Sequence, residues 1–535
     1  MPDQPDKSRV SESPTLPGKT GRKRKFDVAD LYSGPISGAD SGRGEDQSGA
    51  GPVDLSEKLR KAYFWITNFA IISPYYDIEF NDQPPKVYHL GDNKSALVLP
   101  SDQSYSSFIL LPLLNLAVRR RCLLVGGPGR GKTASAILMG VLAGYDLTQL
   151  RRAIQHGQPQ MTVSDLLGNP LPADLMNAKN MDDIKIAWRK WLSMRVKIID
   201  EYNRIPTRTQ SALLTVMADN YAEIMDQVYE CPPAAWYLTA NDDAGGGTYQ
   251  VIEALSDRID VVVKALHFNT RFIKDLLQRI ESGSKPEEMV PEEIIFTAAE
   301  LDRMHDEILQ VELSMPLLRR IEFFASQFEF FESGAEQIEY KTKDTAKLSG
   351  IDFRMLASSE QESGKDKLKD PGSQTENGLS VRAIMTCLSF SKALAYFRGS
   401  DVVTFADIRH VLPFVLHDKL VQNAESPFFE MPENKVYRTD KVSWIRRLFD
   451  LSCAEYDRLN LDKKDPIRDL EAEFAEGLEG VTAKETAARM VKIERLLESI
   501  AKQRKLYGHV FDDVLKLKYL HQRYTNYRRW LEWKE

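Results

Sequence analysis

The chain has 535 residues, of which 42% are hydrophobic and 28% are charged, and its formal net charge is −7. This length exceeds what one hydrophobic core usually organises, so several folded units are expected. The acidic balance disfavours a dedicated nucleic-acid coat, because such binding needs a dense positive face. The longest apolar run, 108–118, is too short to cross a bilayer, and the four cysteines lack a metal-binding spacing. With no apolar signal segment at the start, the composition predicts a cytoplasmic protein without a membrane span.

The first segment, residues 1–53, is rich in Ser, Gly, Pro, Asp and Lys and poor in large apolar residues. Such a composition cannot bury enough surface to offset the entropy that is lost on ordering, so we expect a disordered tail. A basic run at 21–26 is a candidate docking patch or localisation signal, but a solvated charge run is the more common meaning of such a stretch.

Residues 54–270 alternate between helical and strand patterns. An amphipathic helical pattern opens the segment at 55–72, and short apolar runs at 121–127, 195–201 and 234–242 each end in polar residues. Helical patterns lie between these runs, as is typical of a mostly parallel sheet wrapped by helices. We therefore predict an α/β core over 54–270.

Strand signals fade after about residue 270. Helical patterns at 271–280, 315–331, 381–397 and 405–416 predict a smaller all-helical domain over 271–425. A stretch at 341–377, dense in Lys, Asp, Ser, Gly and Gln, interrupts this domain, and we expect it to be a mobile insertion.

The last segment, 426–535, is predicted to be a helical C-terminal extension. Its clearest pattern places apolar residues at spacings of 3, 4 and 3, namely Met490, Ile493, Leu497 and Ile500. This spacing suits a helical hairpin or a partner-binding coiled coil.

The stretch GGPGRGKT at 126–133 fits the pattern G-x-x-x-x-G-K-[ST], and it lies between a predicted buried strand and the start of a helix. Glycines let backbone N–H groups wrap a phosphate, Lys132 neutralises the β- and γ-phosphates, and the Thr133 hydroxyl can ligate Mg²⁺. A chance glycine-rich turn explains the glycines, but not the strand, the Lys-Thr pair and the helix together. The residues expected to contact ATP are Gly126, Gly127, Pro128, Gly129, Arg130, Gly131, Lys132, Thr133 and Ala134.

Two further predicted strands end in polar side chains. One ends in Asp200 and Glu201, and adjacent strand-end carboxylates point to different sides, so Asp200 can hold the Mg²⁺ shell while Glu201 polarises a water. Alone, such a pair is more often a solvated acidic pair. The other strand ends at Asn241, whose amide could orient the attacking water, although Asn at a strand end is more often a turn former.

Two arginines are candidates for stabilising charge on the γ-phosphate. Arg258 follows a helical turn, and Arg382 begins a predicted helix of the second domain. Each could instead form a surface ion pair. A guanidinium supplied by a neighbouring subunit is worth about 10³ to 10⁵ in rate.

These motifs stand in an order that resembles the MoxR family of AAA+ ATPases. The resemblance spans about 55–420 and rests on DEYNRIP, TQSALL, LTAND, GTYQVIEALSDRID and GLSVRA, which follow the phosphate loop in that order. It implies an AAA+ P-loop fold with an all-α lid. It also implies that Asn241 is the first sensor, that Arg258 acts on the ATP of a neighbouring subunit, and that Arg382 is the second sensor, reporting the γ-phosphate to the lid.

The resemblance implies a Mg²⁺-dependent ATPase that works as a hexameric ring and remodels or matures a protein client, together with a von Willebrand factor A domain partner. Two alternatives remain. A nucleic-acid motor is suggested by basic and aromatic residues mixed at 504–509 and 524–534, although aromatic residues at helical spacing are more often core. The second alternative is a non-hydrolysing scaffold gated by ATP, but the presence of Glu201, Asn241 and Arg258 argues against it.

Overall fold

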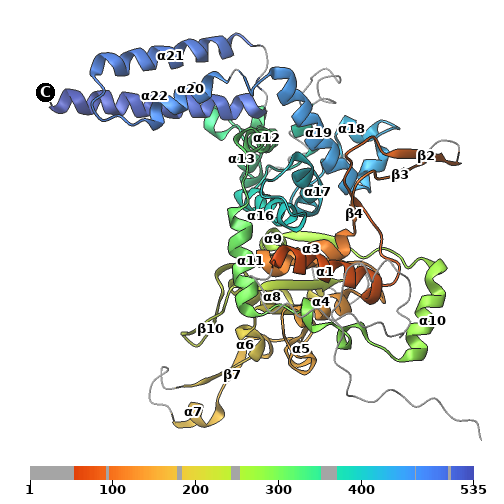
Figure 1. Cartoon of the computed structure of the whole chain (residues 1–535). Helices are drawn as coiled ribbons and strands as arrows, with labels where there is room; N and C mark the ends of the chain where they lie inside the picture. Colours follow the sequence, from red (N-terminus) through yellow and green to blue (C-terminus); the bar gives the residue numbers. More distant parts are fainter. Residues whose placement is uncertain are drawn as a thin grey trace, which may run out of the picture.

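The computed structural model describes residues 54–91, 95–177, 184–241, 253–350, 370–463, 465–503, 506 and 508–534. The expected tail at 1–53 and the middle of the expected insertion, 351–369, lie outside these residues. Figure 1 shows an α/β core with helical layers above it and a long helical arm at the C-terminal end.

The core is built on a sheet of five parallel strands in the order β13-β5-β12-β9-β6. The three strands predicted from apolar runs occupy its centre, and β12 is buried along its whole length. Burial on both faces explains why these strands are continuous apolar runs rather than alternating ones. The strands are β5 (Arg121–Val125), β12 (Ala235–Ala240), β9 (Val196–Asp200), β13 (Val261–Lys264) and β6 (Gln155–His156).

Helices cover this sheet and confirm the predicted α/β core. The apolar run at 108–118 forms α3 (Ser107–Val118), which is buried almost throughout because it packs between the sheet and the lid helix α16 (Val381–Phe397). The other core helices are α1 (Leu55–Trp65), α4 (Lys132–Leu142), α5 (Leu147–Ala153), α6 (Val163–Leu167), α7 (Pro172–Asn177), α8 (Thr207–Asp219) and α9 (Glu253–Arg258). In the described part of the chain, no helix combines the length and apolar character that crossing a bilayer requires.

Three antiparallel hairpins project from the core, and none of them was predicted from the sequence. Met225 and Asp226 turn one of them with φ of 50° and 63°, the left-handed geometry that suits a two-residue hairpin loop. The hairpins pair β2 (Lys86–Leu90) with β3 (Ser95–Leu99), β7 (Gly168–Pro170) with β8 (Ile186–Trp188), and β10 (Tyr221–Ile224) with β11 (Gln227–Glu230).

The predicted all-helical lid is confirmed. It contains α10 (Ile273–Ser282), α11 (Ala298–Gln310), α12 (Met315–Ser326), α13 (Lys343–Leu348), α16 and α17 (Phe405–Leu416). The expected insertion at 341–377 is anchored at both ends, because the buried Lys343 Nζ donates to the carbonyl oxygens of Gly372 at 2.6 Å and Thr375 at 2.9 Å.

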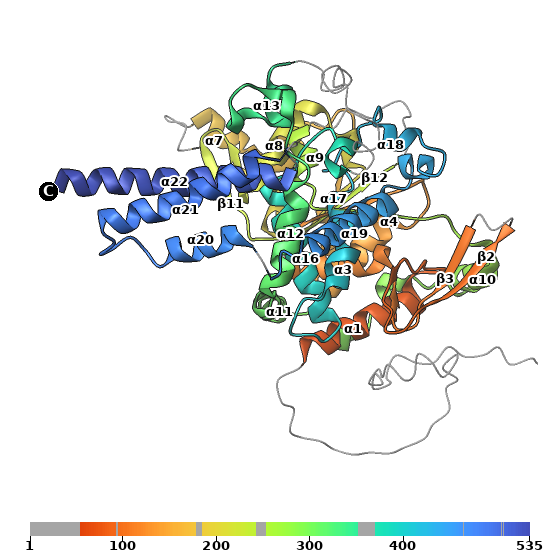
Figure 2. The same ribbon diagram turned by 90° about the horizontal axis from the view of Figure 1, so that it is seen from above.

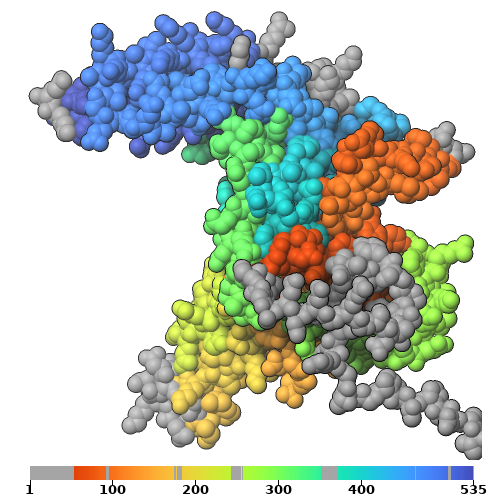
Figure 3. Space-filling view, in the orientation of Figure 1, coloured from red at the N-terminus to blue at the C-terminus, as the bar shows by residue number. Residues whose placement is uncertain are grey.

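The C-terminal extension is helical, as predicted. It comprises α18 (Pro427–Glu430), α19 (Lys441–Leu459), α20 (Pro466–Ala475), α21 (Ala483–Ala501) and α22 (Gly508–Lys534). The last three helices form an arm with its own hydrophobic cluster, which includes Met490 and Ile493 of the predicted pattern and Leu517 and Leu520 of α22. Figures 2 and 3 show this arm projecting from the rest of the molecule.

Candidate nucleotide-binding site

The glycine-rich loop leaves the carboxyl end of β5 and enters α4, whose N-cap is Gly131. Gly129 and Gly131 have φ of 71° and 76°, a region that residues with a Cβ rarely adopt. A Cβ on Gly126 would lie 2.7 Å from the carbonyl oxygen of Ala265, which follows β13. A close contact therefore excludes a Cβ at Gly126, and the left-handed backbone favours glycine at Gly129 and Gly131.

Lys132 joins this loop to the end of β12. Its Nζ donates to the carbonyl oxygens of Gly126 at 2.6 Å and Gly127 at 2.8 Å, and to Oδ1 of Asn241 at 2.8 Å. The residue is 7% exposed, so the ammonium is held at the loop rather than in solvent. These contacts place a positive charge where the motif needs it for a bound phosphate.

Asp200 connects three elements at the same edge of the sheet. Its Oδ1 accepts hydrogen bonds from Thr133 Oγ1 at 2.7 Å and Thr239 Oγ1 at 2.6 Å, and its Oδ2 lies 3.3 Å from Nδ1 of His156. The Thr133 hydroxyl and the Asp200 carboxylate are hard oxygen donors of the kind that Mg²⁺ prefers. The side chains present therefore fit this ion.

Glu201 follows Asp200 in a left-handed conformation, with φ of 55°. Its Oε1 accepts a hydrogen bond from Asn241 Nδ2 at 2.8 Å, and its Oε2 lies 3.1 Å from Nε of Arg204. A Cβ on Gly157 would lie 2.2 Å from the Glu201 carbonyl oxygen, so glycine is needed for this close approach. The structure thus brings Lys132, Thr133, Asp200, Glu201 and Asn241 together, as the sequence predicted.

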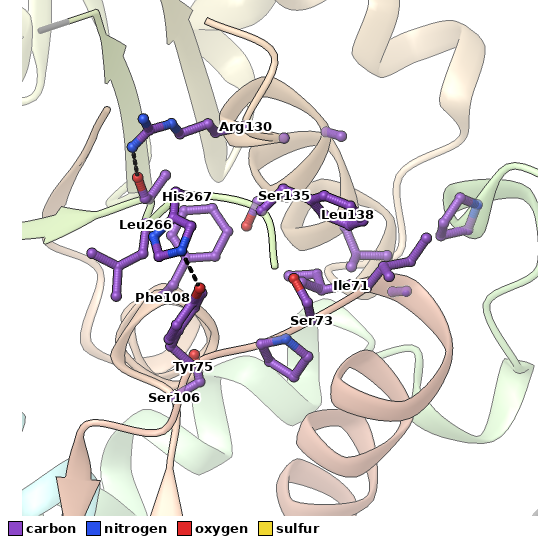
Figure 4. Close-up of a pocket in the computed structure, with 18 of the residues that line it drawn as sticks. Ile71, Ser73, Tyr75, Ser106, Phe108, Arg130, Ser135, Leu138, Leu266 and His267 are labelled. Carbon is purple, nitrogen blue, oxygen red and sulfur yellow. Dashed lines mark hydrogen bonds between the residues drawn. The ribbon is translucent and has the colours of Figure 1, made fainter. Parts of the chain in front are cut away.

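A cavity of about 330 Å³ lies beside the phosphate loop and contacts Gly129, Gly131 and Ala134 (Figure 4). Apolar groups dominate its wall, among them Ile71, Phe108, Leu138 and Leu266. The buried hydroxyl of Ser135 also faces it and has no hydrogen-bond partner among the described residues. A mostly apolar pocket with a few polar groups is the usual form of a small-molecule site. Its position beside the loop fits the nucleoside part of a nucleotide.

Two polar contacts shape this cavity. The hydroxyl of Tyr75 lies 3.0 Å from Nε2 of His267, joining the segment after α1 to the segment after β13. Arg279 of α10 donates to the carbonyl oxygens of Ala70 at 2.6 Å and Phe69 at 2.5 Å, and burial lowers the pKa of its guanidinium. Sequence reasoning missed these residues, because they come from distant segments and belong to no local motif.

The two candidate arginines lie at the opposite edge of the sheet. Arg258 precedes β13, whose Val261 pairs with Cys122 near the start of β5, so Arg258 lies at the amino ends of the strands. Arg382 forms an ion pair with Asp257, next to Arg258. A five-residue strand such as β5 separates this edge from the phosphate loop by about 15 Å. The structure therefore places both arginines at the amino edge, and not at the loop of their own chain.

Buried polar contacts fix this amino edge. The fully buried Asp260 accepts hydrogen bonds from Arg121 Nη1 at 3.1 Å and from Thr386 Oγ1 of α16 at 2.6 Å. Lys419 Nζ donates to the carbonyl oxygen of Asp257 at 2.9 Å, and burial lowers the pKa of this lysine. Within the described chain, Nε of Arg258 is buried and has no acceptor.

Known families match both the core and the lid. The model of the ATPase family associated with various cellular activities (AAA) matches residues 121–261, and that of the AAA lid domain matches residues 372–438, which extends past the predicted lid boundary at 425 and includes α18. A P-loop parallel sheet with a helical lid and these two matches define an AAA+ fold.

One curated relative and one solved structure are also similar to this chain. The chain is 24% identical over 313 residues to the chaperone MoxR1 of Mycobacterium tuberculosis, which covers 58% of this chain and 70% of that relative. A crystal structure of a protein from Cytophaga hutchinsonii is 19% identical with a TM-score of 0.42, covering 63% of this chain and 88% of that one. Together with the AAA and lid matches, the curated relative makes the chain similar to the MoxR family of AAA+ ATPases.

Proposed function

We propose that this chain hydrolyses ATP with Mg²⁺ in a hexameric ring and uses the cycle to remodel or mature a partner protein. The observation that carries the proposal is the contact network of Lys132, Thr133, Asp200, Glu201 and Asn241 beside a cavity of about 330 Å³. Similarity to a protein named as a chaperone supports the remodelling role.

In this proposal the cavity takes the nucleoside and the loop takes the phosphates. The backbone N–H groups of 126–133 and the ammonium of Lys132 bind the phosphate oxygens, while the helix dipole of α4 adds a favourable field. Thr133 and Asp200 would hold Mg²⁺, which when bound neutralises charge on the phosphates. Lys132 would exchange its contacts with the loop carbonyls for contacts with phosphate.

Glu201 is the proposed base that polarises the attacking water. Asn241 and Arg204 each contact one of its carboxylate oxygens, so the carboxylate has a defined orientation. Asn241 also contacts Lys132, and this position lets the amide respond both to the phosphates and to the base. Such a group can orient the water in line with the γ-phosphate.

Assembly follows from the position of the two arginines. Because Arg258 and Arg382 lie at the edge remote from their own loop, we infer that both act on the nucleotide of a neighbouring subunit. An exposed apolar stripe on α10, at the border of the nucleoside cavity, supports assembly. Its residues Ile273, Leu277 and Ile280 are 55%, 51% and 66% exposed, and a neighbouring chain would cover them.

The ring size, the protein client and a von Willebrand factor A domain partner enter this proposal through the family resemblance alone. Co-purification of a partner with a Glu201→Gln protein held in ATP would identify the client.

The test of the proposal is a pair of variants assayed for binding of a fluorescent ATP analogue and for phosphate release. Lys132→Ala should lose both, because the phosphates lose their main cation. Glu201→Gln should bind ATP and lose about 10² to 10⁴ in turnover. Lys86→Ala, on the exposed strand β2, is the control and should match the parent. A Lys132→Ala protein that binds and hydrolyses ATP like the parent would refute the proposal.

A further inference from the structure

Helix α22 carries two different sets of side chains along its length. One set packs against the rest of the arm and is buried, namely Leu517, Leu520 and Tyr524. The other lies on a different face, at spacings of 4, 7 and 3 residues that correspond to whole helical turns, and its first two members contact the arm through the ring of Phe474 on α20. We call this second set the α22 stripe, and its members are Tyr519, Arg523, Trp530 and Trp533.

The stripe is exposed, above all at its far end. Tyr519 and Trp530 are 49% and 43% exposed, and Trp533 is 73% exposed. Isolated large aromatic residues on a surface need no explanation, but two tryptophans on one turn-spaced face are unusual. The sequence pattern had suggested that these rings belong to a core, and for Trp530 and Trp533 that interpretation is wrong.

The end of α22 extends past the hairpin that supports it. The hydroxyl of Tyr527 donates to the carbonyl oxygen of Val481, just before α21 begins at Ala483. The residues after Tyr527 therefore continue beyond α21, as Figures 1 and 2 show. Both faces of this last part of the helix are accessible to another molecule.

Contacts within the helix order the exposed end. Tyr527 and Trp530 stack with ring centroids 5.6 Å apart, and the guanidinium of Arg529 lies 5.7 Å from the ring centroid of Trp533. Arg529 also forms an ion pair with Glu532 at 2.9 Å. A rigid helix that presents ordered aromatic rings loses little side-chain entropy on binding.

The same part of the helix has a positive charge balance, although the whole chain has a net charge of −7. Over 519–534, the length of the stripe and the exposed end, there is one acidic residue, Glu532, against four basic ones, which are Arg523, Arg528, Arg529 and Lys534. The complementary surface is therefore acidic.

We propose that the α22 stripe docks a protein partner whose binding groove has an apolar floor and an acidic rim. An exposed helix that places aromatic anchors at turn spacing matches helix-in-groove recognition. Trp and Arg are the residue types that contribute most to such interfaces. This inference does not depend on nucleotide chemistry.

Two other occupants fit the stripe less well. A second α22 stripe would bring arginine against arginine, which disfavours self-association through this face. Proteins that bind single-stranded nucleic acid track its backbone with a positively charged groove. The α22 stripe lies instead along one side of a projecting helix.

Calcium-loaded calmodulin is a suitable probe, because it binds basic amphipathic helices in an apolar groove with an acidic rim. The full chain would be titrated into fluorescein-labelled calmodulin and followed by fluorescence anisotropy. Trp530→Ala/Trp533→Ala and, separately, Arg523→Glu/Arg529→Glu should each raise the dissociation constant at least about tenfold. Tyr88→Ala is the matched control, since Tyr88 is 50% exposed on the β2–β3 hairpin.

Each other outcome overturns the proposal. Absence of calmodulin binding, or equal binding by the parent and both double variants, would show that the stripe does not recognise this chemistry. Binding of a labelled single-stranded oligonucleotide that the tryptophan variant loses would assign the stripe to nucleic acid. Self-association that the same variant loses in sedimentation velocity would assign it to a second copy. Melting temperatures equal to that of the parent would confirm that the variants fold.

Discussion

At the carboxyl edge of the sheet, Lys132, Asp200 and Asn241 bond to neighbours that an incoming nucleotide can replace or join. At the amino edge, Asp260 is fully buried and links Arg121 of the core to Thr386 of the lid. The first set of contacts lies beside the phosphate loop, whereas the Asp260–Thr386 contact is fully buried. The difference shows how one sheet can bind a ligand at one end while the other end presents arginines on a fixed base.

The largest effect should come from removing the guanidinium at the amino edge. Arg258→Ala should retain ATP binding and lose about 10³ or more in turnover, because the transition-state charge on a neighbour's nucleotide is left uncompensated. Phosphate release measures the loss, and Arg208→Ala, on the exposed start of α8, is the control.

Mixing two inactive proteins tests whether the arginine acts between subunits. A mixture of Arg258→Ala with Glu201→Gln should recover part of the turnover, because some interfaces then combine an intact base with an intact arginine. A mixture as inactive as its components would contradict action across the interface.

A substitution at Asp260 would remove the buried contacts of the amino edge. Asp260→Ala should lower the free energy of unfolding by about 3–5 kcal/mol, since it leaves the Arg121 guanidinium without its buried partner. Urea denaturation followed by circular dichroism measures this change. Asp257→Ala removes a carboxylate that is 40% exposed and should cost at most about 1 kcal/mol. Equal losses from the two substitutions would mean that burial does not distinguish these ion pairs.

A smaller effect is expected from adding one methyl group at the carboxyl edge. In Gly157→Ala the new Cβ would lie 2.2 Å from the Glu201 carbonyl oxygen, so the backbone of the proposed base must move. Displacement of a catalytic group by about 1 Å can cost about 10² in rate, which steady-state phosphate release would detect. Gly480→Ala lies in the remote arm, so it should leave turnover unchanged, although its φ of 80° makes some loss of stability the expected cost.

The local parts of this architecture could be predicted from the sequence. The strand at 121–125, the glycine-rich loop and α4 follow one another directly, so a short pattern with a known geometry predicted all three. The strand-end residues Asp200 and Asn241 were also predictable, because parallel strands bring their carboxyl ends to one edge.

The remaining features depend on contacts between distant segments. The nucleoside cavity joins residues near 71, 108, 138 and 266, and none of these carries a motif of its own. The sequence also could not predict the edge of the sheet at which Arg382 lies. This position depends on how the lid docks on the core through Thr386 and Asp260. The exposure of Trp530 and Trp533 could not be predicted either, because helical spacing alone does not distinguish a packed face from an exposed one.

The hydrogen bonds of Lys343 bear on whether the lid can accept an insertion. The Lys343 ammonium holds residue 343 against residues 372 and 375 by donating to the carbonyl oxygens of Gly372 and Thr375. Lengthening a loop whose ends are already tied costs only a small further entropy. We therefore expect α13 and α16 to keep their packing when residues are inserted between 350 and 370.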